Sequence, residues 1–314
     1  AEAVVMDRDE PPVPRSAMDG FALRAADGQK PRQVLQTVFA GSSELLEIGP
    51  GQACAVMTGG TIPGVPDCVF PVEQTSVTAG QLHLEMAPQV GSHVRTAGEM
   101  GESGRCLLEP GQRLGAGDLA VAAGCGYREL EVFHQPSAFV LSTGDEVVPW
   151  AETPSLHQVR DSNRLGSLLQ LEAAGAFLGG HQHANDNPEE LRAATEAALA
   201  AHDLVVTIGG VSMGQKDYMP TVFEQLGVEC LFHGVSIQPG KPVWVGQREN
   251  TWVLGLPGNP VSSAVILELF APPLIAKLSA QREVIAPLRL RRGHCQGEAR
   301  AKKTRAVHAR FGVI

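Results

Sequence analysis

Apolar residues occur in short runs along the chain, and their spacing divides the sequence into regions of different character. Between residues 28 and 94 the runs are separated by Gly, Pro, Ser and Thr, a rhythm that predicts a small all-β unit. From about residue 136, strand-like runs alternate with helical patterns, which is typical of a doubly wound α/β domain with a parallel sheet. The sequence therefore predicts a multi-domain protein of the α/β plus β class.

Local signals in the α/β region place its elements approximately. Short apolar runs predict strands at 139–141, 204–206, 243–245 and 252–254. A helix is expected to begin at Ser162 or Asn163, whose side chains suit a helix N-cap, and to end at Gly175. Its apolar face would contain Leu165, Leu168 and Leu169. Asn187 and Asn259, each followed by Pro, are expected to cap two further helices.

Five polar loops, four of which contain glycine, are associated with these strands and helices. They are STGDE (142–146), DSN (161–163), TIGGVSMGQKDY (207–218), PGKP (239–242) and LPGNP (256–260). Each loop taken alone is equally well explained as a plain turn. Three of them directly follow strand-like runs, and open α/β sheets bind ligands at the carboxyl ends of their strands. Together the loops predict a ligand site along one edge of the sheet.

The residue types in these loops suit a phosphorylated ligand with a divalent metal. Glycine amides can approach phosphate oxygens, and Lys241 supplies a positive charge. Asp145, Glu146, Asp186 and Asp217 offer the oxygen ligands that Mg²⁺ prefers. Each carboxylate is alternatively a helix cap or a solvated charge. The glycine spacing fits neither a P-loop nor GxGxxG, and no GxSxG elbow occurs, which disfavours ordinary NTPase, dinucleotide and acyl-transfer chemistry.

Charge and cysteine content exclude several other classes of function. The formal net charge of −9 disfavours a general nucleic-acid binder, although nine Lys or Arg residues against two Glu follow from residue 281 onward. The six cysteines are scattered without a CxxC pair, which indicates reduced thiols. We find no signal peptide and no apolar run that approaches membrane-spanning length, so we expect a cytoplasmic protein without membrane contact.

Motifs spread over nearly the whole chain resemble those of a known family. Beside the five loops they include PPVPRSAMDGFALR (11–24), TGGTIPGVPDCVFPVE (58–73) and VLSTGDEVV (140–148), in the family's order. Asp19, in the SAMDG segment, would in isolation be read as a turn residue. The set resembles the molybdopterin molybdenumtransferases, or MoeA proteins, which include the E domain of gephyrin.

This resemblance implies four domains. An elongated dimerisation domain, lacking the family's usual N-terminal helices, would consist of residues 1–27 and 95–135. A small β domain would occupy 28–94, a MogA-like α/β domain 136–280, and the start of a C-terminal β domain 281–314.

The resemblance also implies a reaction and a set of site residues. Molybdate would be inserted into adenylylated molybdopterin with Mg²⁺, releasing AMP, in a cleft between the SAMDG segment of one subunit and the α/β domain of the other. The implied catalytic residues are Asp19, Glu146, Asp186 and Asp217, of which Glu146 and Asp217 would also bind the metal. The implied substrate-binding residues are Ser16, Thr143, Gly144, Asp145, Ser162, Asn163, Gly209, Gly210, Ser212, Gly214, Lys241, Pro242, Pro257, Gly258, Asn259 and Pro260. The expected partners are a second copy of the chain and a molybdopterin adenylyltransferase that delivers the pterin.

The chain departs from the family pattern at a few positions. Met100 stands where an acid is usual, Gln238 where Lys or Arg is usual, and Pro14 and Arg15 precede SAMDG in place of Asp and Asn. These differences motivate a second hypothesis, a catalytically impaired, gephyrin-like protein that binds the pterin or acts as a scaffold. A third hypothesis, an adenylyltransferase acting one step earlier, is disfavoured by the SAMDG segment, which such single-domain proteins lack.

Overall fold

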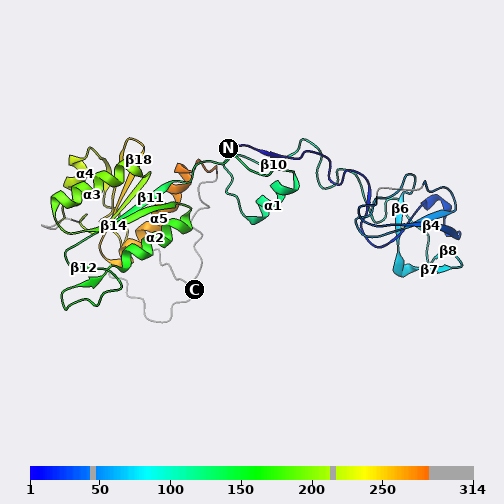
Figure 1. Ribbon diagram of the computed structural model, residues 1–314, viewed down its shortest axis with the longest axis horizontal. Helices are drawn as coiled ribbons and strands as arrows, with labels where there is room; N and C mark the ends of the chain where they lie inside the picture. Colours follow the sequence, from blue (N-terminus) through cyan, green and yellow to red (C-terminus); the bar gives the residue numbers. More distant parts are fainter. Residues whose placement is uncertain (43–46, 213–216, 283–314) are drawn as a thin grey trace. The chain divides into compact units, whose positions relative to one another are not determined.

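The computed structural model describes residues 1–42, 47–212 and 217–282 of the chain. The chain forms two compact units (Figure 1). The first contains Ala1–Pro110 and Leu114–Glu131, and the second contains Gly111–Arg113 and the chain from Val132 onward. Residues 111–113 and 132–135, which the sequence assigned to the elongated domain, therefore cluster with the α/β unit.

A six-stranded sheet forms most of the first unit, with strand order β6-β3-β5-β4-β8-β7. The strands are β3 (Gly20–Leu23), β4 (Arg32–Val38), β5 (Gln52–Val56), β6 (Cys68–Pro71), β7 (Thr75–Thr78) and β8 (Gln81–Leu84). Two short 3₁₀ helices, Ala25–Asp27 and Val72–Gln74, connect them. All pairs are antiparallel except β4 with β5.

The sheet begins earlier in the sequence than residue 28, the predicted start of the β domain. Strand β3 lies between β5 and β6, and its side chains alternate between two buried clusters. Phe21 and Leu23 pack with Phe70 on one side, while Ala22 packs with Val69 on the other. Because β3 is covered on both faces, it is an integral part of this sheet.

The remainder of the first unit joins the start of the chain to a segment about a hundred residues later. Strand β1 (Val4–Val5) pairs with β10 (Cys106–Leu108), and β2 (Arg15–Ser16) pairs with β9 (Val94–Arg95). Helix α1 (Ala116–Gly124) completes this part and lies where the sequence has a weak helical pattern. Val4 packs with Leu108, Ala122 and Cys125, so the small core here comes from both chain segments. Whether this part forms a dimerisation domain stays a prediction.

The second unit contains a mixed sheet with strand order β14-β11-β15-β18-β17-β16. The strands are β11 (Ser137–Thr143), β14 (Phe177–Ala184), β15 (Leu204–Ile208), β16 (Glu229–His233), β17 (Trp244–Arg248) and β18 (Thr251–Leu256). The first four in the order are parallel, but β17 runs antiparallel to both its neighbours. The prediction of an all-parallel sheet is therefore wrong. Residues 249 and 250 alone link β17 to β18, and so short a link can only join antiparallel strands.

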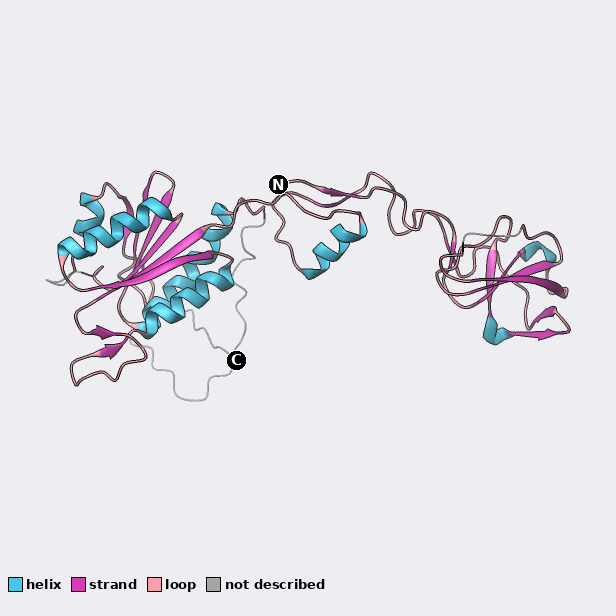
Figure 2. Cartoon of the chain, viewed as in Figure 1, coloured by secondary structure: helices cyan, strands magenta, loops and turns pink. Residues whose placement is uncertain are grey.

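Helices cover both faces of this sheet, as the doubly wound prediction requires (Figures 1 and 2). They are α2 (Ser162–Ala174), α3 (Pro188–Ala201), α4 (Met219–Gln225) and α5 (Pro260–Leu278). Helices α2 and α5 contribute Leu171 and Ile266 to one buried cluster. Helices α3 and α4 contribute Leu191 and Phe223 to the cluster on the other face. A small parallel ribbon, β12 (Val147–Val148) with β13 (Val159–Arg160), lies between β11 and α2 in the sequence.

Helix α2 differs from its prediction at its start and in its buried face. Its N-cap is Asp161, whose side chain accepts from the backbone N of Arg164, so neither Ser162 nor Asn163 caps it. The buried face consists of Arg164, Ser167, Leu168 and Leu171, whereas Leu165 and Leu169 are 44% and 56% exposed. Apolar periodicity misplaced this face because two of its members are polar. The ends at Gly175, Asn187 and Asn259 are confirmed.

Helix α5, which Asn259 caps, is long and apolar. The helix has 19 residues, and an 18-residue window within it has a mean hydropathy of 1.6. By length and composition it is therefore long and apolar enough to cross a membrane, contrary to our expectation of no such run. A helix in the core of a protein passes the same test. Here Ile266, Leu267 and Ile275 are fully buried against α2 and the sheet, and Pro272 and Pro273 lie inside the helix.

Candidate functional site

The predicted loops of the second unit meet at one edge of its sheet. Register pairs place Thr143 beside Ala184, and Ile208 beside both Ser142 and Leu256. Parallel strands β11, β14, β15 and β18 therefore end level with one another, and the loops that follow them are neighbours. Strand β17 runs the opposite way and pairs Trp244 with Gly255, so the PGKP segment that precedes it reaches the same edge.

Gly209 and Gly210 allow β15 and β11 to approach closely at this edge. Both have left-handed backbones, with φ of 94° and 66°. A Cβ on Gly209 would lie 2.7 Å from Thr143 Oγ1, and one on Gly210 would lie 3.0 Å from Met219 Cγ. Thr143 Oγ1 donates to the carbonyl of Ile208 at 3.2 Å. Gly209 donates its own N–H to the carbonyl of Leu256 at 2.9 Å, so that amide is not available to a ligand.

The LPGNP loop is tied to the start of α2 and to its own helix. Asn163 Nδ2 donates to the carbonyl of Gly258 at 2.8 Å. Asn259 Oδ1 accepts from the backbone N of Val261 at 3.1 Å and of Ser262 at 3.2 Å, which makes it the cap of α5. Ser263 Oγ donates to the carbonyl of Pro257. Much of this loop thus serves to hold its own shape.

The PGKP segment packs directly against α5. Gly240 has φ of 117°, and a Cβ there would lie 2.6 Å from Ile266 Cγ1. The carbonyl of Lys241 accepts from Val235 N at 2.9 Å. Its side chain is exposed and has no hydrogen bond or ion pair with the part of the chain that the structure describes. Lys241 is therefore a solvated cation beside the edge, with Pro242 leading into β17.

Four predicted carboxylates lie on adjacent loops at this edge. Asp145 Oδ1 accepts from the backbone N of Asp186 at 3.0 Å. The carboxylate of Glu146 folds back over Gly144, where an added Cβ would lie 2.8 Å from Glu146 Oε2. Asp217 comes two residues before Met219, whose N–H donates to Gly210 O at 3.2 Å.

These carboxylates do not form a preassembled metal centre. No group of three His, Cys, Asp or Glu residues suited to a metal ion occurs among residues 1–42, 47–212 and 217–282. Mg²⁺ usually takes one or two protein carboxylates and completes its shell with waters and substrate phosphates. Glu146 and Asp217, on two of these loops, offer carboxylates of that kind.

Asp19 and Ser16 belong to the first unit. Asp19 Oδ1 accepts from the backbone N of Thr58 at 2.7 Å and from its hydroxyl at 2.8 Å. The backbone bond, followed by the hydroxyl bond, lowers the pKa of Asp19 below its ordinary value, so the carboxylate is ionised at neutral pH. Ser16 is buried and its hydroxyl donates to Met18 O at 2.5 Å, which stabilises the turn before Asp19.

Two of the predicted assignments lie wholly or largely outside the described residues. Gly214 belongs to the stretch 213–216, and the C-terminal β domain would fall almost entirely within 283–314. Ser212 is the last residue described before the first of these gaps and is exposed.

Comparison with known proteins supplies what geometry alone does not. Residues 1–126 match the MoeA N-terminal region, domains I and II, and residues 139–277 match a probable molybdopterin binding domain. The molybdopterin molybdenumtransferase of Synechococcus elongatus is 37% identical over 292 residues, which cover 89% of this chain and 72% of the relative. That of Haemophilus influenzae is 36% identical over 286 residues, covering 90% of this chain and 70% of the relative.

The chain belongs to the MoeA family. A crystal structure of a MoeA protein from Pyrococcus horikoshii has a TM-score of 0.71 and 30% identity, covering 90% of this chain and 74% of that one. The family and the enzyme class predicted from the sequence are thereby confirmed, as are the β region of the MoeA N-terminus and the MogA-like domain, whose sheet is mixed and not all-parallel as expected. The individual roles of the site residues stay predictions.

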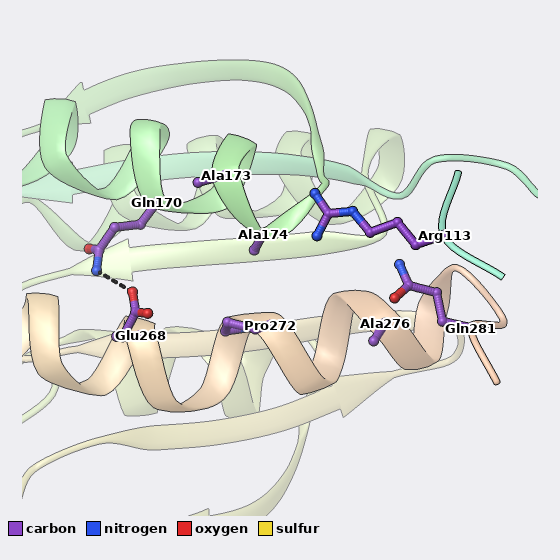
Figure 3. Close-up of a pocket in the computed structure, with 8 residues that line it drawn as sticks. All are labelled: Arg113, Gln170, Ala173, Ala174, Glu268, Pro272, Ala276 and Gln281. Carbon is purple, nitrogen blue, oxygen red and sulfur yellow. Dashed lines mark hydrogen bonds between the residues drawn. The ribbon is translucent and has the colours of Figure 1, made fainter. Parts of the chain in front are cut away.

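A groove of the MoeA-type α/β unit lies away from the carboxyl edge. It encloses about 300 Å³ between α2 and α5 (Figure 3). Its lining residues are Arg113, Gln170, Ala173, Ala174, Glu268, Pro272, Ala276 and Gln281. Gln170 Nε2 donates to Glu268 Oε2 at 3.2 Å and partly bridges the two helices. None of the predicted site residues lines this groove, because it faces the later turns of both helices.

Sequence analysis of this MoeA family member missed a buried polar network at the site. Asp161, treated as part of the DSN motif without a role of its own, is 4% exposed and contacts Ser142 and Arg164. The sequence does contain a signal for this network: Asp161 lies three residues before Arg164 at the start of the helix. An Asp in that position can both cap the helix and form an ion pair with the Arg.

Proposed function

We propose that this chain catalyses the Mg²⁺-dependent insertion of molybdate into adenylylated molybdopterin, with release of AMP. The observation that carries the proposal is the meeting of five loops at one sheet edge, where Lys241 and four carboxylates lie among glycines. Such an edge suits an anionic, phosphorylated ligand with a bound cation. Its neighbours in the family, named molybdopterin molybdenumtransferases, support the choice of reaction.

Each group has a distinct task in this proposal. Lys241 attracts the phosphate of the adenylate, and Gly210 and Gly258 let the backbone approach the ligand. Glu146 and Asp217 hold Mg²⁺, which when bound neutralises charge on the phosphate oxygens. Asp145 orients the Asp186 loop through the hydrogen bond to its amide. Asp19, held in place by its two hydrogen bonds from Thr58, is an ionised acceptor at neutral pH.

We also propose that the working form is a cytoplasmic homodimer that receives its pterin from a molybdopterin adenylyltransferase. Asp19 would then act in the site of the partner subunit. A complementation experiment tests this arrangement directly. Asp19→Asn and Asp217→Asn are each expected to abolish AMP release, whereas a refolded mixture should recover about a quarter of wild-type activity, because half the dimers carry one intact site. A mixture as inactive as its components argues against a shared site.

The reaction itself is tested with the purified 314-residue chain. It would be given adenylylated molybdopterin, Mg²⁺ and molybdate, and AMP would be measured by chromatography. Release that depends on both Mg²⁺ and molybdate supports the proposal. Folded protein that releases no AMP above background contradicts it, and ATP-dependent adenylylation of free molybdopterin would indicate the earlier step instead.

The alternative of an impaired, scaffold-like homologue is supported by a specific observation. Met100 is 62% exposed at the position of an expected acid, so it contributes little to packing and supplies no charge. Gln238 is exposed directly before the cis Pro239 of the PGKP segment. The double variant Met100→Asp with Gln238→Lys discriminates between the hypotheses. A gain of about tenfold or more in AMP release indicates a degenerate site, because each charge-assisted contact contributes roughly 1.5–3 kcal/mol.

A further inference from the structure

Asp161 is a buried carboxylate with all its contacts inside the α/β unit. It is 4% exposed. Its Oδ2 accepts from Ser142 Oγ at 2.7 Å and lies 2.9 Å from Arg164 Nε, while its Oδ1 accepts from Arg164 N at 3.2 Å. Arg164 is itself 8% exposed, and its guanidinium carbon lies 5.2 Å from the ring centre of Trp150. The charge pair is therefore enclosed by protein.

This network connects the chain segments that carry the candidate site. Ser142 immediately precedes Thr143 and Gly144 at the end of β11. The backbone N of Asp161 donates to Val148 O at 2.9 Å, and that of Val159 donates to Glu146 O at 2.8 Å. The ribbon that holds Glu146 is thus attached to the same residue that caps α2.

A third loop is attached through the next residues of the chain. Asn163, in the first turn that Asp161 caps, donates to the carbonyl of Gly258. One buried carboxylate therefore sets the positions of the STGDE, DSN and LPGNP loops relative to one another. Because buried hydrogen-bonded charges tolerate little displacement, a shift at Asp161 would move all three loops.

We propose that Asp161 is a positioning residue that, through Ser142 and the β12–β13 ribbon, holds Gly144 and Glu146 in register with Gly258. The inference rests on the proposed function, since it assigns Asp161 the task of presenting Glu146 to Mg²⁺. The proposal gives Asp161 no contact with the ligand, since it is 4% exposed and both its oxygens already contact Ser142 or Arg164. Hydrogen-bonded supports of this kind typically change metal affinity or activity by about 10–100-fold when removed.

The two ends of strand β11 offer a matched pair of variants. At the other end of the strand, Ser137 Oγ donates to Asp203 Oδ2 at 2.9 Å. Ser142→Ala and Ser137→Ala thus each delete a serine hydroxyl that donates to an aspartate, and Ser142→Ala also removes a contact of 3.3 Å with His183 Nδ1. Both are expected to lower the midpoint of urea unfolding by similar amounts.

Only Ser142→Ala should alter the candidate site. Hydrogen exchange, measured without substrate, should become about tenfold faster at the amides of Gly144 and Val147, because the carboxyl end of β11 loses its anchor. The Mg²⁺ concentration for half-maximal AMP release should rise about tenfold. The KM for adenylylated molybdopterin should change less than about twofold, since the groups that bind the pterin are retained.

A second variant covers the case in which Ser142→Ala does not fold. Asp161→Asn keeps an oxygen to cap α2 but removes the charge that faces Arg164, and the same changes in exchange and Mg²⁺ dependence are expected. If the exchange rates and Mg²⁺ dependence of the folded variants match those of Ser137→Ala, Asp161 is a structural cap and the inference is wrong. If wild-type protein releases no AMP, the proposed function fails, while the exchange measurement still decides the positioning role.

Discussion

Replacing Gly209 with alanine tests whether the close approach of β15 to β11 requires glycine. The φ of Gly209 is 94°, and left-handed backbone costs a residue with a Cβ about 1–2 kcal/mol. The new Cβ would lie 2.7 Å from Thr143 Oγ1 and 3.2 Å from Thr143 O. Rotating the hydroxyl away would lose its bond to Ile208 O, at a further cost of about 1 kcal/mol. We therefore expect Gly209→Ala to destabilise the α/β unit by about 2–3 kcal/mol.

Tryptophan fluorescence during urea unfolding provides the assay. All three tryptophans, Trp150, Trp244 and Trp252, lie in the second unit, so their signal reports on that unit. With a urea dependence of about 2–3 kcal/mol/M, the midpoint should fall by about 1 M.

Gly258→Ala serves as the control within the same site. A Cβ there would lie 3.9 Å from Gly209 Cα, an ordinary contact, and the residue is exposed. It should change stability by less than about 0.5 kcal/mol. Equal midpoints for the two alanine variants would refute the argument that packing against Thr143 dictates glycine at 209.

Three further predictions concern buried polar groups. Arg32 is fully buried in the first unit, where its guanidinium donates to the carbonyls of Arg24, Gly28 and Lys30. Arg32→Met should therefore destabilise that unit by about 3–5 kcal/mol, and an unchanged midpoint of urea unfolding, measured by circular dichroism, would contradict this prediction. Thr207 Oγ1 is buried and has no hydrogen-bond partner in the described chain. Thr207→Val should therefore leave the free energy of unfolding unchanged or raise it by about 1 kcal/mol, whereas a lower free energy of unfolding would show that the hydroxyl does form a hydrogen bond. Burial lowers the pKa of His202, so this side chain binds a proton more readily in the unfolded chain than in the folded one. The free energy of unfolding should therefore fall as the pH drops below about 6.5. His202→Gln should weaken this pH dependence in urea titrations at several pH values, and an unaltered dependence would show that His202 does not cause it.

Sequence signals were reliable where the physics is local. A cap side chain bonds amides two and three residues away, so Asn187 and Asn259 could be assigned without knowing the fold. Gly175 ends α2 because its own backbone is left-handed, with φ of 103°. The strand that ends at Ile208 was recognisable because all its residues are buried and it begins with the apolar run at 204–206.

Local pattern failed where a partner distant in the sequence decides the outcome. The cap bond of Asp161 to Arg164 is local, but its bond from Ser142, a residue 19 positions earlier, could not be predicted from the pattern. Residues 21–23 could be recognised as a strand, but only their pairing with β5 and β6 shows that the strand belongs to the β sheet.

The gathering of polar glycine loops at one sheet edge was determined by the sequence alone, since strand ends follow from alternating strand and helix patterns. Only the tertiary structure decided which groups in those loops remain available to bind a ligand. Gly209 uses its amide to bond Leu256, whereas Lys241 stays solvated beside the same edge. The physical reason is that hydrogen-bond satisfaction depends on neighbours in space, and composition or periodicity along the chain does not encode those neighbours.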